Sequence, residues 1–368
     1  MGTAGNCYHG GAFFSAIGSD FACLERSGDI ISADVLDAWF EPSPKVIEAL
    51  RAYLPWALKT SPPTHCDGLI GAISAARGIP IRNICAEAGS SRLIFGAFPL
   101  LLSKGAKVLL LNPSYGEYKF FLENVRGCQV IWFSDYENAS YGFDVWKLLR
   151  TVREQNIDAV VLVNPNNPTG HLVSRAEMEA LCASLPDRVT LWVDEAYIDY
   201  AGREHSVEDL ARRQGNVVVC KSMSKAYALS GARCAYLVAD ERLTARLRQR
   251  TPPWAVSLPA QVAGVFALKD YGYYQRRYEE TKQLKAELLR GLERFLPARL
   301  LPGHMNSILS ECEPSLDVGA FLEKCRKDRL YLRPVANMGS DWGANAFRVS
   351  VKDRRTNRAM LGIMERAV

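Results

Sequence analysis

The sequence lacks any run of apolar residues long enough to cross a membrane, because nothing in it approaches about 18 unbroken apolar residues. Its N-terminal apolar stretch, GGAFFSAIG, is short and rich in Gly and follows no charged region, so it is not a convincing signal peptide. Lys and Arg outnumber Asp and Glu only by 45 to 40, and no basic stripe typical of nucleic acid binding is present. We therefore expect a soluble, cytoplasmic protein that binds neither membranes nor nucleic acid.

The ten cysteines form neither a C-x-x-C pair nor a cluster with His at the spacing of a zinc site. Several of them lie inside apolar runs, where cysteine behaves as a small hydrophobic residue. The sequence also contains no internal repeat and no low-complexity segment. We expect free thiols, a reducing compartment and no metal site.

A chain of 368 residues is long enough for two domains. Its middle alternates short runs of branched apolar residues with amphipathic segments such as 174–184. This pattern is typical of strands buried on both faces of a parallel sheet, with helices as connections. The predicted strands are KVLLLN (107–112), QVIWFS (129–134), AVVLVN (159–164), TLWVDE (190–195), NVVVCK (216–221) and CAYLVA (234–239).

The pattern changes after Thr251, where a long charged amphipathic helix is expected over 273–295. Three further strands are predicted in NSILSECE, YLRPVA and AFRVSV, followed by a last helix from Thr356 onward. The expected fold is α/β, with a three-layer, mostly parallel-sheet large domain and a smaller α+β domain. We place an N-terminal segment, which joins the small domain and covers the active site, at 1–50, the large domain at 51–270 and the small domain at 271–368.

Two motifs place polar side chains where predicted strands end. NPNNPTG (164–170) follows one strand, and its prolines and glycine predict a rigid turn that presents the amide of Asn167. The alternative is a plain surface turn. In WVDEAYIDY (192–200), Asp194 ends a strand and Tyr197 follows three residues later. They suit a carboxylate that keeps a heteroaromatic nitrogen protonated and a phenol that bonds a ring oxygen, while the alternative for Asp194 is a helix cap.

A third motif, VCKSMSKAYALSGARCAY (219–236), contains two lysines. Ser222, Ser224 and Arg233 supply hydroxyls and a guanidinium that suit a phosphate. A lysine among such groups can have an altered pKa and can form an imine with an aldehyde. Lys225 is the predicted reactive amine, whereas Lys221, at the end of a strand, is predicted to be structural.

The fourth motif is AEAGSSRLIF (86–95), where Ser90 and Ser91 open an apolar helix whose free N–H groups form an anion site. In NPSYGEY (112–118), Tyr115 follows a strand and could stack on a flat cofactor, or could simply pack in the core. A phosphate cradle, an aromatic face, a partner for a pyridine nitrogen and an imine-forming lysine are together the parts of a pyridoxal phosphate site.

With these motifs the sequence resembles the fold-type I pyridoxal-phosphate enzymes, and most of all histidinol-phosphate aminotransferase and threonine-phosphate decarboxylase. The resemblance extends from Ser43 to the last helix, and its most specific motifs are NPNNPTG, DEAY and SMSKAYALSGAR. It implies pyridoxal 5'-phosphate as cofactor and a homodimer with active sites at the subunit interface.

The resemblance also implies a role for each site residue. Lys225 would be the Schiff-base lysine and Asp194 the partner of the pyridine nitrogen. Arg348 would bind the substrate α-carboxylate, and Arg333 the other end of the substrate or its phosphate. The remaining cofactor contacts would be Tyr197 and Asn167 to the ring O3′, Tyr115 on the ring face, and Ser90, Ser91, Ser222, Ser224 and Arg233 around the phosphate.

The sequence departs from these relatives at three places. Residues 36–39 read LDAW instead of an N-E-N-P-like stretch, which concerns substrate recognition. Residues 61–68 read SPPTHCDG and lack the tyrosine that the relatives lend to the partner's phosphate, so Ser61 and His65 are the candidates to replace it. Ser90 and Ser91 replace an acidic pair. At the N-terminus, YHGGAF resembles the H-G-G of threonine-phosphate decarboxylases, which makes His9 a candidate substrate ligand.

Our leading hypothesis is an aminotransferase-like enzyme that acts on a small α-amino acid, with Lys225 carrying the proton. The second is a decarboxylase of a phosphorylated amino acid, which the H-G-G stretch supports. The third is elimination or cyclisation of a hydroxylated amino acid in specialised metabolism, which the departures at 36–39 and 61–68 would suit. A non-catalytic protein that retains the fold is disfavoured because every cofactor position is filled.

Overall fold

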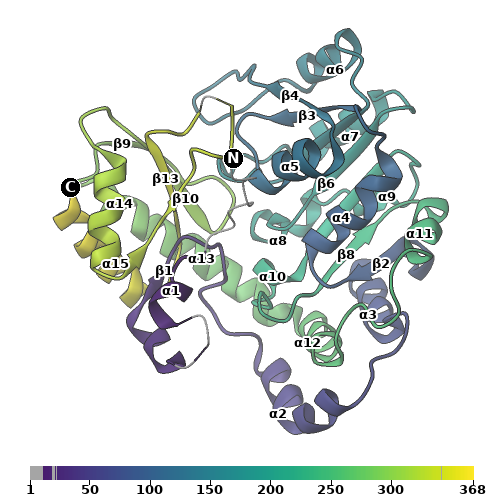
Figure 1. Cartoon of the computed structure of the whole chain (residues 1–368), viewed down its shortest axis with the longest axis horizontal. Helices are drawn as coiled ribbons and strands as arrows, with labels where there is room; N and C mark the ends of the chain where they lie inside the picture. The colour runs from purple at the N-terminus through teal and green to yellow at the C-terminus, as the bar shows by residue number, and fades with distance from the viewer. Residues whose placement is uncertain (1–10, 19–20, 22, 341) are drawn as a thin grey trace, which may run out of the picture.

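The computed structural model describes residues 11–18, 21, 23–340 and 342–368 (Figure 1). Its larger part is built on a seven-stranded sheet with the order β2-β8-β7-β6-β5-β3-β4. Strands β3 to β7 run parallel, and β8 runs antiparallel to both of its neighbours, β2 and β7. The strands are β2 (Ile84–Glu87), β3 (Lys107–Leu111), β4 (Gln129–Phe133), β5 (Ala159–Val163), β6 (Thr190–Asp194), β7 (Val217–Ser222) and β8 (Ala235–Val238).

The six predicted strands of this sheet are confirmed, and β2 is an addition that the prediction did not contain. Every residue of β5 and β7 is buried, as expected of strands covered on both faces. One face packs against α4 (Ser90–Leu101), α5 (Gly116–Phe120) and α11 (Glu241–Arg248). The other face packs against α3 (Asp67–Arg77), α6 (Val145–Glu154), α7 (Arg175–Ser184) and α12 (Leu258–Leu268). The three-layer α/β prediction is therefore confirmed.

A second, antiparallel sheet has the order β12-β13-β10-β9 and lies at the left of Figure 1. Its apolar face is covered by α13, α14 and α15, whose buried leucines, methionines and Phe321 form a separate core. The elements are α13 (Tyr271–Leu292), β9 (Ala298–Leu301), β10 (Ser307–Cys312), α14 (Val318–Lys327), β12 (Arg333–Pro334), β13 (Ala346–Ser350) and α15 (Arg354–Ala367).

The prediction of one continuous strand in YLRPVA is wrong. The segment forms two short strands, β11 (Leu330–Tyr331) and β12, which belong to different sheets. β11 pairs in parallel with β1 (Ile31–Ser32), whereas β12 pairs with β13. The chain changes partner at Leu332, so the two halves cannot continue one ladder.

The N-terminal segment lies against the C-terminal part of the chain through the pairing of β1 with β11. It contains α1 (Phe14–Ile17) and a 3-10 turn (Leu24–Asp29), and it leads into α2 (Pro44–Lys59), which packs on α12. The predicted boundaries at residues 50 and 270 stay a prediction.

None of the helices in the described part of the chain is long and apolar enough to span a bilayer. The nine cysteines of the described residues are free thiols, and all but Cys23 are buried.

Candidate active site

Polar side chains at or just after the ends of four parallel strands meet at one edge of the large sheet, the edge that the carboxyl ends of these strands form. Asp194 is the last residue of β6 and Ser222 the last residue of β7, while 164–170 follows β5 and 112–118 follows β3. Because parallel strands all end at the same edge, their carboxyl ends place these segments together. The one-turn helix α10 (Met223–Ala226), which follows β7 directly, brings Lys225 to this edge.

Lys225 lies with only 20% of its side chain exposed. Its Nζ donates a hydrogen bond to Oδ1 of Asp37 at 2.8 Å. Burial lowers the pKa of Lys225, and Arg348 and Arg233 act in the same direction, whereas Asp37 opposes them. A lysine with a lowered pKa is more readily available as a neutral, nucleophilic amine.

The backbone of the Lys225 turn is held from behind by two tyrosines. The phenol of Tyr200 donates to the carbonyl oxygen of Lys225 at 3.1 Å, and the phenol of Tyr278 donates to that of Ala226 at 3.0 Å. Lys225 is thus presented on a fixed backbone.

Asp194 is a buried carboxylate without a cation in contact among the described residues. Its Oδ2 accepts from the Tyr118 phenol at 2.7 Å, and its Oδ1 accepts from the Ala196 amide at 3.0 Å. Burial raises the pKa of Asp194 to about 6, against the opposing effect of these two bonds. It is not a helix cap, since the following helix α8 (Ile198–Ala201) has Tyr197 at its N-cap. A protonated ring nitrogen would supply the cation that this carboxylate lacks.

Asn167, Tyr197 and Arg348 lie together at the same edge. Asn167 is 2% exposed, so the plain surface-turn alternative is wrong, and its Oδ1 accepts a short hydrogen bond from Nη1 of Arg348. Burial lowers the pKa of Arg348 to about 10, and the nearby Tyr197 acts against this shift. Burial also raises the pKa of Tyr197, which Arg348 opposes, so its phenol stays a neutral hydrogen-bond donor.

An anion cradle lies where α4 begins beside Arg233. Ser90 and Ser91 form the first turn of α4, and Gly89 is its N-cap with φ +96°. A Cβ built on Gly89 would come within 2.4 Å of Nη2 of Arg233, so the glycine lets the guanidinium lie against the helix start. On the other side, the Oγ of Ser224 accepts from Nη1 of Arg233 at 3.4 Å, and the Oγ of Ser222 accepts from the Ser224 amide.

We expect Gly89→Ala to weaken binding of pyridoxal phosphate by about tenfold or more. The new methyl group would displace Arg233, and the residue would have to adopt a φ that favours glycine. The measurement is the dissociation constant of the cofactor by absorbance titration, with Gly105→Ala as the control. Gly105 also has a positive φ, but a Cβ at that position would have no neighbouring atom within 4 Å. Equal losses in both variants would contradict the role of Gly89 in the cradle.

The other predicted residues are placed as follows. Tyr115 is half-buried, is the N-cap of α5, and packs at 6.0 Å edge-on to Tyr118. Arg333 is 2% exposed and lies opposite Arg348 in the β12–β13 ladder, close enough to lower its pKa. His9 lies outside the described residues.

Two residues of this edge were not among the predicted site residues. Tyr118 reaches Asp194 and also accepts a hydrogen bond from the Trp192 indole at 2.9 Å. Its only sequence signal is its place three residues after Tyr115 in the same motif. Asp37, the partner of Lys225, lies in the segment 36–39 that departs from the relatives, and this departure is the signal that could have identified it.

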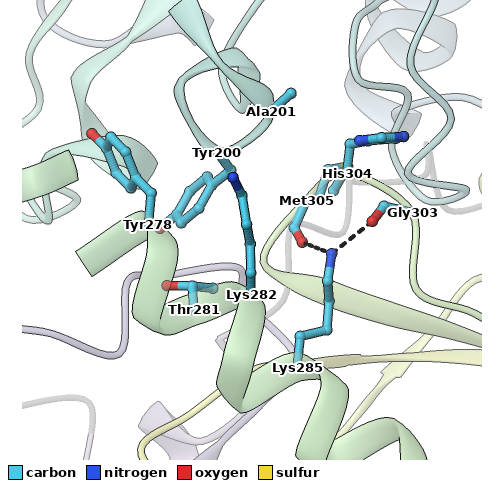
Figure 2. A pocket seen from close by; sticks show the side chains of 9 residues that line it. All are labelled: Tyr200, Ala201, Tyr278, Thr281, Lys282, Lys285, Gly303, His304 and Met305. Carbon is cyan, nitrogen blue, oxygen red and sulfur yellow. Dashed lines mark hydrogen bonds between the residues drawn. The ribbon is translucent and has the colours of Figure 1, made fainter. Parts of the chain in front are cut away.

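A cavity of about 410 Å³ is lined in part by Tyr200 and Tyr278, the two tyrosines that hold the Lys225 turn (Figure 2). Lys285 projects into it and donates to the carbonyl oxygens of Pro302, Gly303 and Met305 at 2.6 to 2.9 Å. Burial lowers the pKa of Lys285 to about 8. Because three carbonyls already use its three donors, this lysine braces the loop, and the cavity contains none of the predicted site residues.

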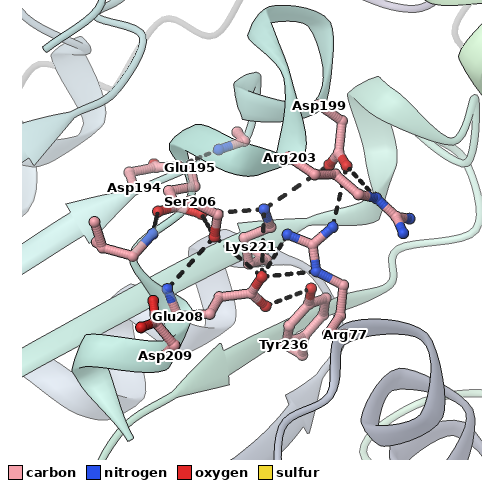
Figure 3. Close-up of polar contacts among 12 residues, drawn as sticks. Arg77, Asp194, Glu195, Asp199, Arg203, Ser206, Glu208, Asp209, Lys221 and Tyr236 are labelled. Atoms are coloured by element: carbon pink, nitrogen blue, oxygen red, sulfur yellow. Dashed lines mark hydrogen bonds and ion pairs between the residues drawn. The ribbon is translucent and has the colours of Figure 1, made fainter. Parts of the chain in front are cut away.

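Lys221, the other lysine of the motif, lies in a buried ionic network below the sheet edge (Figure 3). Its Nζ lies 3.1 Å from Oε2 of Glu195, the residue after Asp194, and 3.8 Å from Asp199. Arg77 contributes a second cation, which pairs with Asp199 and Glu208. The ion pair of Lys221 and Glu195 thus joins the end of β7 to the end of β6, next to the segments that carry Lys225 and Asp194.

Lys221→Met should destabilise the fold by roughly 3 kcal/mol, because it leaves Glu195 ionised and buried without its nearest cation. The free energy of unfolding from a denaturant titration measures this loss. In the control, Lys147→Met removes a lysine from an exposed pair with Asp135, and we expect a change below about 0.5 kcal/mol. An unchanged midpoint for Lys221→Met would rule out a stabilising role for the network.

The sheet order and the lysine turn after β7 define the class of the protein as the fold-type I pyridoxal-phosphate enzymes. Solved structures agree: a histidinol-phosphate aminotransferase from Sinorhizobium meliloti in complex with pyridoxal-5'-phosphate superposes with a TM-score of 0.82, at 20% identity, over 91% of this chain and 89% of that one. L-threonine-O-3-phosphate decarboxylase from Porphyromonas gingivalis gives a TM-score of 0.78, at 18% identity, over 92% and 99% of the two chains.

More particularly, the chain belongs to the aminotransferase class I and II family, whose model matches residues 34–362. It is 29% identical to histidinol-phosphate aminotransferase 1 of Cupriavidus pinatubonensis, over 82% of this chain and 78% of the relative. It is 27% identical to the histidinol-phosphate aminotransferase of Methanocella arvoryzae, over 97% and 94%. The family uses pyridoxal 5'-phosphate, and the chain is a pyridoxal-phosphate-dependent enzyme of this family.

Proposed function

We propose that the protein transfers the amino group of a small α-amino acid, with Lys225 as the catalytic residue. The observation that supports this most directly is the presence, at the same sheet edge, of a largely buried lysine of lowered pKa and a buried arginine. Arg348 is held by Asn167 and by the carbonyl of Asp34, so its guanidinium is oriented before a substrate arrives. A fixed, desolvated guanidinium is suited to an α-carboxylate.

The residues at this edge fit pyridoxal phosphate. Asp194 has no cation in contact among the described residues, and the Gly89 cradle offers Arg233 and the start of α4 to a dianion. In this proposal Ser90, Ser91, Ser222, Ser224 and Arg233 hold the phosphate, Asn167 and Tyr197 bond the ring hydroxyl, and Tyr115 covers the ring. When bound, the cofactor supplies the electron sink for breaking a bond at the substrate α-carbon.

The protein's own contribution is to orient the substrate and to move a proton. Arg348 fixes the α-carboxylate, and the α-hydrogen is then turned toward Nζ of Lys225, which accepts the proton and returns it. The lowered pKa of Lys225 favours the neutral amine that this transfer needs. Arg333, beside Arg348, is proposed to contact the remainder of the substrate through hydrogen-bond acceptors of that part.

The test is a panel of amino acids given to the cofactor-loaded protein together with a keto acid. We expect a visible spectral change and conversion of the keto acid to an amino acid, followed by product mass. Release of carbon dioxide without a new keto acid would favour decarboxylation, and loss of ammonia or water without an acceptor would favour elimination or cyclisation. Failure of the protein to bind the cofactor would overturn the proposal as a whole.

We further propose that the protein is a homodimer. The helix α2 exposes Tyr53, Leu54, Trp56 and Leu58, an apolar group of the kind that marks an interface. Nearby, the amide of Trp254 donates to the carbonyl of Thr64 at 3.3 Å, and the Trp254 side chain is 56% exposed. Segment 61–68, with Ser61 and His65, would then reach the partner's cofactor phosphate. Sedimentation of the loaded protein measures the oligomeric state.

A further inference from the structure

Asp37 places a carboxylate next to the reactive lysine. Its Oδ1 accepts hydrogen bonds from Nζ of Lys225 at 2.8 Å and from Oγ of Ser230 at 2.6 Å. Its Oδ2 has no hydrogen-bond partner in the part of the chain that the structure describes. The Asp37 side chain is 41% exposed, twice the 20% of Lys225, although both are engaged with each other. The carboxylate therefore faces open space beside a largely buried amine.

The segment that carries Asp37 runs from the arginine to the lysine of the site. At one end, the carbonyl of Asp34 accepts from Nη2 of Arg348 at 2.9 Å. In the middle, the carbonyl of Leu36 accepts from Nδ2 of Asn306 at 3.1 Å. At the other end is the contact of Asp37 with Lys225. A substrate between these two groups would lie next to this segment, with Asp37 beside it.

Among the described residues, Lys225 is the only cation in direct contact with Asp37. Lys225 and Lys352 are the two cations that act on it, and among the described residues Lys352 forms no ion pair. Tyr197 and Tyr200 also face Asp37, but both are neutral phenols whose pKa values burial raises. Once Nζ of Lys225 is engaged in the chemistry of the cofactor, Asp37 keeps only the hydroxyl of Ser230 as a direct partner. A partly buried carboxylate then favours a new cation.

We propose that Asp37 is a specificity-determining residue that selects amino acids with a positively charged side chain, an ammonium, guanidinium or imidazolium group. This inference rests on the proposed function, since it requires the amino acid to lie between Arg348 and Lys225. The same carboxylate repels a phosphate or a second carboxylate at that place. Asp37 therefore selects a different substrate class from phosphorylated amino acids.

The test compares arginine with citrulline, which has nearly the same shape but a neutral ureido group, by spectral titration of the cofactor-loaded protein. We expect arginine to bind at least about tenfold more tightly, because a charge-assisted hydrogen bond contributes that much. Asp37→Asn should abolish the preference, because it should weaken the binding of arginine and leave the binding of citrulline nearly unchanged. Asp37→Glu, which keeps the charge, should retain part of it. Asp135→Asn, which removes an exposed carboxylate paired with Lys147, is the matched control and should behave as the wild type.

Equal binding of arginine and citrulline by the wild type, or tighter binding of O-phosphothreonine than of arginine, would overturn the inference. A preference that survives in Asp37→Asn would also overturn it. These three results would leave the proposed function intact, because they presuppose a loaded protein that binds amino acids. A wild type that takes up no cofactor would instead refute the proposed function, and the inference with it. Should Asp37→Asn not fold, Ser230→Ala and Asp37→Glu decide, since each must change the arginine preference without removing the charge.

Discussion

Replacing Lys225 by Ala will reduce turnover by at least about 10⁴-fold. In the proposed function, the substitution removes both the amine that would attach the cofactor and the group that would carry the substrate proton, and proton transfer alone is worth up to about 10⁴. In the part of the chain that the structure describes, the site offers no second amine in the same position, because Lys221 points into the ionic network with Glu195 and Lys352 acts on Asp37 without a hydrogen bond to it. Asp37 would lose its hydrogen-bonded cation but remain partly solvated.

The measurement combines turnover with a chemical label. After loading with pyridoxal phosphate and reduction with borohydride, peptide mapping of the wild type should give the added mass at Lys225 alone. Lys225→Ala should give none, and it should lose the visible absorption of the bound cofactor. Lys327→Ala is the control, since Lys327 is an exposed residue at the end of α14. A label at another lysine in the wild type would contradict the assignment.

The strands of the large sheet could be predicted because their signal is local. Each run consists of consecutive branched apolar residues, and burial on both faces requires nothing else. The prediction of one strand in YLRPVA is wrong because the signal there is not local. Its composition suits a strand, but which sheet each half joins depends on β1, some 300 residues earlier in the chain. Pairing of that kind leaves no periodic pattern in the segment itself.

The residues of the site also divide into those that a local motif predicts and those that depend on contacts between distant parts of the chain. Asn167, Asp194, Ser222 and Lys225 stand at strand ends that the sheet brings together, so their motifs predicted their common location. The contact of Asp37 with Lys225 joins residues 188 positions apart, and that of Tyr118 with Asp194 joins residues 76 positions apart. Neither follows from a motif. The first depends on how the N-terminal segment crosses the sheet edge, and the second on how α5 packs against β6. Composition and spacing report neither.

Asp194→Asn should lower turnover by about 10²- to 10³-fold, the size of effect expected when a fixed charge at a reacting group is lost. The amide keeps the shape of the carboxylate, so its oxygen can still accept from the Ala196 amide and its NH₂ can donate to the Tyr118 phenol. The change therefore removes the negative charge that would stabilise a protonated ring nitrogen, together with the acceptor of the Tyr118 hydroxyl proton. Tyr118→Phe, which keeps that charge and removes one hydrogen bond, should cost much less, on the order of tenfold.

Asp194→Asn, which should lower turnover, should nevertheless stabilise the cofactor-free protein relative to the wild type as the pH rises. Burial raises the pKa of Asp194 from 3.8 to about 6, so the folded protein binds this proton more tightly than the unfolded chain. The stability that results is fully present below about pH 4 and is lost as the pH rises through about 6, a difference of roughly 3 kcal/mol. The amide side chain of the variant does not titrate, so the free energy of unfolding of Asp194→Asn minus that of the wild type should increase between these pH values and then stay constant.

Adding cofactor at neutral pH should make the wild type the more stable of the two proteins, since only the carboxylate gains a cationic partner. A difference that is independent of pH, or a variant that cofactor stabilises as much as the wild type, would contradict the assignment of Asp194 as the partner of the ring nitrogen.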